Sequence, residues 1–136
     1  MADIYREQIL DHSRHPRNFG TLENADITYE DTNPLCGDRV RIDVKVANGK
    51  IADIKFSWRG CAISQAAASM LTEMMVGEPL EAVRELTAQE LLDELGVPIS
   101  PARVKCALLG LKVLKSGAYG ITDWPPQDAA HIGEEN

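Results

Sequence analysis

The sequence predicts a small α+β domain in which an antiparallel hairpin is flanked along the chain by helices. Residues 38–46, DRVRIDVKV, alternate apolar and charged side chains with the period of a half-buried strand. Residues 100–117, SPARVKCALLGLKVLKSG, repeat apolar side chains at the spacing of one helix face. With 136 residues, of which 44% are apolar and 26% charged, the chain can form one soluble domain with its own core.

The other elements follow in order along the chain. Residues 2–20 open with a helical pattern that Pro16 and Gly20 end, because both residues interrupt a helix. Thr87 and Glu90 have the spacing of a capping box, which predicts the start of a short helix. Further helices are expected within 62–77, 78–86, 87–96 and 100–117, and strands within 25–33, 38–46 and 51–58.

Parity restricts the register of the hairpin. A two-residue loop at Asn48–Gly49 would set apolar positions of one strand against polar positions of the other. We therefore expect a three-residue loop over 47–49 with Gly49 in the left-handed conformation. The expected pairs are Val40 with Phe56, Ile42 with Ile54, and Cys36 with Gly60. This register brings Cys36 and Cys61 together at one end of the hairpin.

The charge balance excludes two classes of partner. The net charge of −7 argues against nucleic acids and anionic membranes, because both require a basic surface. No apolar run reaches the roughly 18 residues of a membrane span. The N-terminal segment MADIYREQIL lacks the pattern of a secretory signal, so we expect a cytoplasmic protein.

The three cysteines, Cys36, Cys61 and Cys106, are odd in number and too widely spread along the chain for a disulfide framework. In a reducing compartment, thiols serve metal binding, catalysis or packing. For Cys106 alone, on an apolar helix, inert packing is the better interpretation. For Cys61 the two interpretations are balanced, and for Cys36 the functional one leads because glycine and aspartate follow it.

Asp38 joins the cysteines as a candidate ligand, because residues two apart on a strand point the same way. Cys61 is expected at the start of a helix, where unpaired N–H groups favour a thiolate. Arg103 lies one helical turn before Cys106, where a guanidinium could support an anionic sulfur. Three thiolates and one carboxylate form a four-ligand set of the kind that zinc or iron takes.

Other polar and sulfur-containing residues are interpreted as structural. His12 and His15, near the end of the first helix, are expected to be surface or capping groups. Three methionines are expected to fill the core: Met70, Met74 and Met75.

Several motifs together resemble the IscU/SufU family of iron–sulfur cluster assembly scaffolds, which also forms the N-terminal part of NifU. The matching segments are YREQILDHSRHPRNFG, NPLCGDRVRI, RGCAISQAAASMLTE and PARVKCALLGLKVL. The resemblance covers nearly the whole chain except its tail. It implies one scaffold domain over residues 1–124, with a flexible acidic tail over 125–136.

The resemblance implies a three-stranded antiparallel sheet with helices packed on it and the ligand cysteines at one exposed end. It also implies that the chain is a scaffold and sulfur acceptor rather than a conventional enzyme. A cysteine desulfurase would load sulfur on Cys36, Cys61 or Cys106, and a transient [2Fe–2S] cluster would pass to recipient apo-proteins. The implied ligands include Asp38, which we expect at the open end of the site. Frataxin-like and chaperone partners are further candidates.

Two departures separate this chain from the IscU branch. Lys105 stands where that branch has a histidine, and PARVK replaces its Leu-Pro-Pro-Val-Lys chaperone motif. The chain also lacks the extra segment that SufU members carry between the second and third cysteines. Two alternatives remain open: a zinc-bound persulfide relay of the SufU type, and an interaction module with a structural metal. We expect zinc in protein isolated in air.

Overall fold

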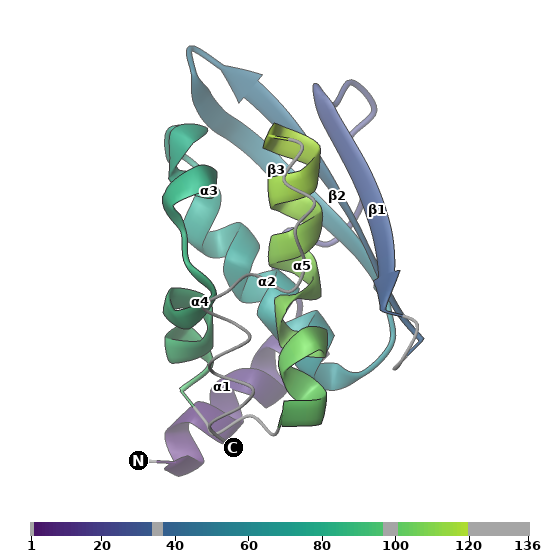
Figure 1. Cartoon of the computed structure of the whole chain (residues 1–136), viewed down its shortest axis with the longest axis vertical. Helices are drawn as coiled ribbons and strands as arrows, with labels where there is room; N and C mark the ends of the chain where they lie inside the picture. The colour runs from purple at the N-terminus through teal and green to yellow at the C-terminus, as the bar shows by residue number, and fades with distance from the viewer. Residues whose placement is uncertain (1, 34–36, 97–100, 120–136) are drawn as a thin grey trace.

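A three-stranded antiparallel sheet with the order β1-β2-β3 forms one layer of the protein (Figure 1). The structure is a computed structural model, and it describes residues 2–33, 37–96 and 101–119. The strands are β1 (Ile27–Asn33), β2 (Asp38–Ala47) and β3 (Lys50–Arg59). The helices are α1 (Ala2–Arg14), α2 (Ala62–Met75), α3 (Glu81–Glu85), α4 (Ala88–Leu95) and α5 (Pro101–Tyr119). The predicted α+β class and the order of elements are confirmed.

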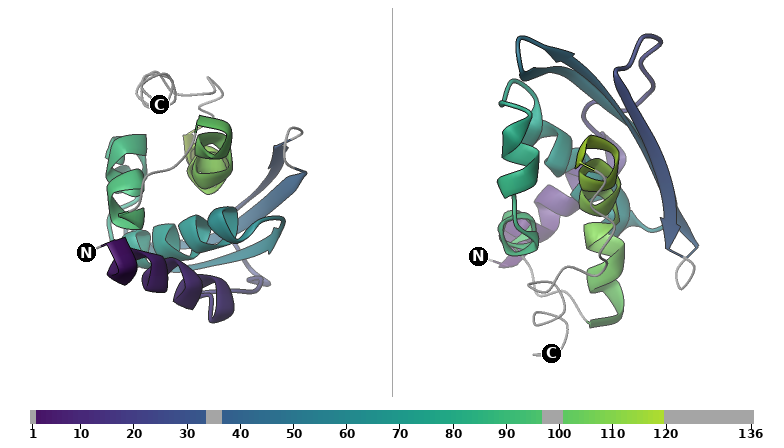
Figure 2. Two further views of the ribbon diagram at one scale, coloured as in Figure 1. Left: turned by 90° about the horizontal axis from the view of Figure 1, so that it is seen from below. Right: turned by 45° about the horizontal axis from the view of Figure 1, so that its top comes forward.

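The helices gather on one face of the sheet (Figure 2). Helix α5 packs against β1 and β2, while α2 packs against β3 and α5. Helices α1 and α4 contact α2 on its other sides, which explains why every residue from Ser64 to Thr72 is buried. A helix that is apolar nearly all round needs this enclosure, because no side of it can face water.

The hairpin register differs from the predicted one by two residues. Asn48 and Gly49 form a two-residue turn and both have positive φ, 55° and 74°. A β-bulge follows, in which Ala52 has no partner on β2. Because this extra residue shifts the pairing by one, apolar residues of β2 again lie opposite apolar residues of β3, which a two-residue turn alone would not allow. The positive φ at Gly49 is confirmed, but the predicted pairs are wrong: Val40 pairs with Trp58, Ile42 with Phe56 and Val44 with Ile54.

The outward face of β2 is not uniformly exposed to solvent. Asp43 was expected on the wet face of the strand, but it is only 1% exposed. Its carboxylate accepts hydrogen bonds from the backbone N–H of Leu22 at 3.0 Å and the hydroxyl of Thr28 at 2.9 Å. Asp43 therefore anchors the chain segment that runs over this face before β1.

Several local predictions are confirmed. Thr87 and Glu90 form the capping box at the start of α4. Met70 and Met75 are buried and Met74 packs against the core. The predicted apolar stripe of α5 is fully buried: Val104, Leu108, Leu111 and Leu114. These side chains belong to the hydrophobic core.

Candidate metal centre

Asp38, the first residue of β2, is completely buried although it carries a carboxylate. Its Oδ1 atom accepts a hydrogen bond from the backbone N–H of Cys61 at 2.8 Å. The sheet brings the two residues together, because Arg39 pairs with Arg59 and the next residues outward are Asp38 and Gly60. Asp38 was expected at the open end of the site, and that expectation is wrong. A buried carboxylate requires hydrogen bonds, which the N-terminus of α2 supplies.

Gly60 permits this close approach. A Cβ atom at position 60 would lie 2.7 Å from Cγ and 2.9 Å from Cα of Asp38, and the backbone φ is 147°. Any other residue would therefore displace the carboxylate. Gly60 was not among the predicted site residues, and its place directly before Cys61 was the only signal in the sequence.

Cys61 is the N-cap residue of α2 and its thiol is free and half-buried. Its sulfur lies 3.6 Å from Oδ2 of Asp38. The first turn of α2 contains no acidic residue, so the positive end of the helix dipole acts directly on this sulfur. The expected position of Cys61 at a helix start is confirmed.

Trp58 and Ser64, which were not among the predicted site residues, form a hydrogen-bonded pair next to Cys61. The indole N–H of Trp58 donates to Oγ of Ser64 at 2.8 Å. The Ser64 hydroxyl donates to the Cys61 carbonyl at 3.0 Å, and its oxygen lies 3.7 Å from the Cys61 sulfur. Ser64 is 1% exposed, so its single proton has only these nearby acceptors to choose between.

Cys106 reaches the same place from α5. It is 1% exposed, and one donor atom each from Asp38, Cys61 and Cys106 lie within 4.8 Å of one another. Cys106 is disulfide-bonded in the structure, so metal binding through its sulfur requires reduction first. Two sulfurs and one carboxylate oxygen at this separation fit the donor chemistry of zinc and of iron in iron–sulfur sites. No other group of metal-ligating side chains at this spacing occurs within the described ranges.

Two predicted site residues cannot be placed. Cys36 lies outside the described residues, so its convergence with Cys61 remains a prediction. The predicted register no longer supports it, because the observed pairing places Asp38, not Cys36, level with Gly60. Arg103 belongs to α5, but its side chain is not among those described. The predicted tail, residues 125–136, also lies outside the described ranges.

His12 belongs to a different polar cluster. It was expected to be a surface or capping group, yet it is only 5% exposed. Its Nδ1 atom lies 2.7 Å from Oγ of Ser69, and its Nε2 atom lies 3.4 Å from Oε1 of Glu73. Burial lowers the pKa of His12, so the neutral imidazole is favoured. This histidine therefore links α1 to α2 through Ser69 and Glu73. Neither contact was predicted from the sequence.

The chain resembles known proteins over most of its length. A family model described as NifU-like N terminal domain matches residues 4–127. The chain is 40% identical to the iron–sulfur cluster assembly scaffold protein IscU of Aquifex aeolicus, covering 84% of this chain and 73% of that protein. It is 37% identical to the zinc-dependent sulfurtransferase SufU of Bacillus subtilis, covering 84% and 88%.

A solved structure supports the same relationship. A putative iron–sulfur cluster assembly scaffold protein for the SUF system from Fervidobacterium islandicum superimposes with a TM-score of 0.70 at 30% identity. The match covers 85% of this chain and 97% of that one. Within the described part of the chain, no helix combines the length and the apolar character needed to cross a membrane.

Proposed function

The chain belongs to the NifU-like N-terminal domain family of iron–sulfur cluster assembly scaffolds, and from this premise we propose that it builds a [2Fe–2S] cluster and transfers it to apo-proteins. The observation that carries the proposal is the approach of donor atoms from Asp38, Cys61 and Cys106 to within 4.8 Å of one another. Cys36 completes the proposed ligand set. Iron and sulfur are the substrates of this site, and the assembled cluster is its product.

Cys61 is the proposed first sulfur acceptor among the two described cysteines, because its thiol is free and half-buried while Cys106 is 1% exposed. The Cys61 thiolate attacks the outer sulfur of a persulfide on a cysteine desulfurase. The donor's S–S bond breaks, the donor cysteine leaves as a thiolate, and Cys61 carries the persulfide. Converting that sulfur to sulfide takes two electrons from a separate reductant. Arg103, one helical turn before Cys106, is the proposed support for sulfur anions on the α5 side.

Asp38 has two roles in this proposal. Its Oδ1 atom holds the backbone of Cys61, and Oδ2 faces the sulfur at 3.6 Å. A carboxylate is a harder ligand than a thiolate and binds iron less strongly. One weak ligand among three thiolates would favour release of the finished cluster to an acceptor.

A zinc-bound sulfur relay is the second candidate function. The SufU of Bacillus subtilis, a relative at 37% identity, is named a zinc-dependent sulfurtransferase. The same donors fit zinc, which would organise the thiols while persulfide passes through without cluster formation. A third possibility, a purely structural metal, predicts that metal removal unfolds the domain.

One experiment separates these functions. The reduced full-length protein is incubated anaerobically with ferrous iron, cysteine, a reductant and a cysteine desulfurase, and its visible spectrum and labile sulfide are followed. A scaffold develops the absorption of a [2Fe–2S] cluster and two sulfides per cluster. A relay retains zinc and gains persulfide without that absorption. Asp53→Asn, at a half-buried position near the other end of β3, serves as a control for loss of a carboxylate away from the site.

A further inference from the structure

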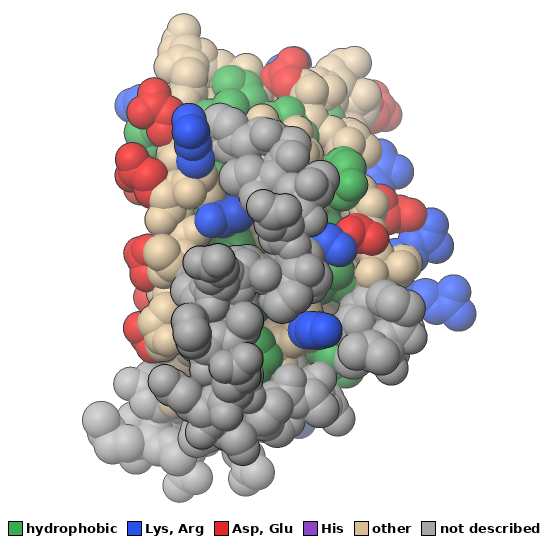
Figure 3. All heavy atoms as spheres, viewed as in Figure 1, with side chains coloured by type: hydrophobic (Ala, Val, Ile, Leu, Met, Phe, Trp, Pro, Cys, Tyr) green, Lys and Arg blue, Asp and Glu red, His purple; other side chains and the backbone are tan. Residues whose placement is uncertain are grey.

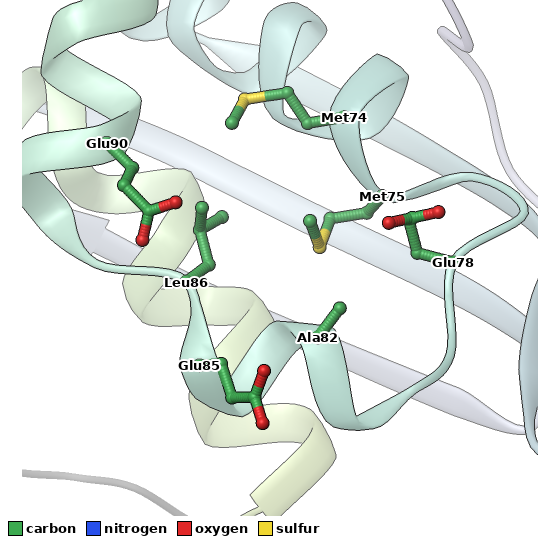
Figure 4. A pocket seen from close by; sticks show the side chains of 7 residues that line it. All are labelled: Met74, Met75, Glu78, Ala82, Glu85, Leu86 and Glu90. Carbon is green, nitrogen blue, oxygen red and sulfur yellow. The ribbon is translucent and has the colours of Figure 1, made fainter.

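A depression with apolar side chains at its floor and glutamates around it lies at the end of α2 opposite Cys61 (Figure 4). The 14 residues of α2 separate the two places by about 20 Å. The side chains of Met74, Met75 and Leu86 form its floor. Its volume is about 450 Å³, enough to receive one or two side chains of another molecule.

Three glutamates surround this floor. Glu78, Glu85 and Glu90 lie on different sides of the apolar side chains (Figure 4). The Glu90 carboxylate accepts hydrogen bonds from Thr87 in the capping box. Among the described residues, no ion pair engages the carboxylates of Glu78 or Glu85, so both can still receive a cation.

The surrounding segment carries most of the protein's excess negative charge. Residues 78–95 contain six carboxylates and one cation, Arg84, which gives −6 + 1 = −5 of the total −7. Acidic side chains line the edge formed by α3 and α4 (Figure 3). The carboxylates in question are Glu78, Glu81, Glu85, Glu90, Asp93 and Glu94. This field attracts cationic groups from a distance.

We propose that this depression and its three glutamates, the acidic groove, bind a basic amphipathic helix of a partner protein. Apolar side chains of that helix would enter between Met74, Met75 and Leu86, while flanking lysines or arginines pair with the glutamates. Val76, which follows Met75 in the chain, is 40% exposed and could add to the apolar contact. A second copy of this chain is a poorer occupant because both copies carry a charge of −7. Binding at this end leaves the metal centre open, and the inference does not depend on the metal chemistry.

The test uses a fluorescent 15-residue peptide with leucines at helical spacing i, i+3, i+7 and six lysines, bound to the full-length protein. The Glu78→Gln/Glu85→Gln variant should weaken binding by about fivefold or more, since two charge pairs are lost. The matched control is Asp93→Asn/Glu94→Gln, which removes the same charge from residues that do not line the groove. The affinity of this control variant for the peptide should stay within about twofold of the affinity of the parent protein.

Methyl NMR locates the bound peptide. With ¹³C-methyl methionine, the signals of Met74 and Met75 should shift on peptide addition, whereas the signal of Met70, which lies near Gln8 of α1, should not. A peptide of the same composition with its leucines scattered should bind at least about fivefold more weakly. Unshifted Met74 and Met75 signals at saturation, equal weakening by both double variants, or equal binding of the scattered peptide would each overturn the proposal.

Discussion

The Asp38 carboxylate bridges two parts of Cys61: one oxygen accepts its backbone N–H at 2.8 Å and the other lies 3.6 Å from its sulfur. One side chain on β2 thus fixes both the start of α2 and the position of a candidate ligand. We expect this single buried group to couple folding to metal binding.

Gly60→Ala should weaken metal binding while the domain stays folded. The added methyl would collide with the Asp38 carboxyl group, whose Cγ lies 2.7 Å from the Cβ position, and would displace it from Cys61. The strained φ of 147° adds about 1–3 kcal/mol of destabilisation. Zinc affinity, measured by competition with a chromophoric chelator, should fall by about tenfold or more.

Gly77→Ala is the matched control. Gly77 also has positive φ, 84°, but a Cβ there would meet no atom within 4 Å. This variant should therefore lose stability to a similar degree and keep its zinc affinity. Equal affinities in the two variants would mean that the Gly60–Asp38 contact does not shape the site.

Substitutions of Asp38 should separate its structural role from its role as a ligand. Asp38→Ala leaves the Cys61 N–H without its acceptor, which should cost about 1–3 kcal/mol in the free energy of unfolding. Asp38→Asn keeps an acceptor oxygen and removes the charge, so it should retain more stability and still bind metal weakly. Urea denaturation and zinc titration of both variants measure the two effects. Identical unfolding energies for both variants would argue against the Cys61 hydrogen bond.

Ser64→Ala should alter the environment of Trp58. The indole N–H loses its acceptor at 2.8 Å and the Cys61 sulfur loses a hydroxyl 3.7 Å away. In a Trp124→Phe background, zinc addition to the reduced protein should change Trp58 fluorescence, and Ser64→Ala should reduce that change. Ser64→Thr, which keeps the hydroxyl, should restore it. A response that is the same in all three proteins would show that Ser64 does not connect Trp58 with the metal centre.

Stability should decrease as the pH falls below the unfolded pKa of histidine, about 6.5. Burial is the main cause that lowers the pKa of His12 in the folded protein, and Arg17 acts in the same direction, while Glu73 and Asp11 oppose it. The unfolded chain therefore binds a proton before the folded one does, at up to about 1.4 kcal/mol per pH unit. Urea denaturation between pH 7.5 and 5.5 should show this loss. His12→Gln should have a flatter profile, and an unchanged slope would exclude His12 as its source.

The sequence predicted the elements better than their contacts. Alternation in β2 and the Thr87 capping box depend on neighbouring residues, so local patterns were sufficient for both. The predicted register was wrong because it did not include the β-bulge at Ala52. The alternation of apolar and polar residues in β2 and β3 gives no sign of this bulge. His12 was misplaced because its burial depends on α2 packing over it, which helix periodicity alone does not determine.

The candidate site shows the same division. Asp38 and Cys61 were selected by residue type and spacing, and Cys106 by its motif. The burial of Asp38, the clearance at Gly60 and the support from Ser64 depend on how β2, β3 and α2 meet. Each of these features depends on how separate elements pack together, and no short sequence motif predicts that packing.

The proposed function depends on Asp38, Cys61 and Cys106 acting with Cys36 as one ligand set. X-ray absorption of the reduced, zinc-loaded full-length protein tests it most directly. We expect three sulfur neighbours at about 2.3 Å and one oxygen at about 2.0–2.2 Å, with the oxygen lost or replaced in Asp38→Ala. Zinc bound by nitrogen and oxygen atoms only would contradict this ligand set. So would a set of zinc-bound atoms that is the same in the parent protein and in Cys61→Ser.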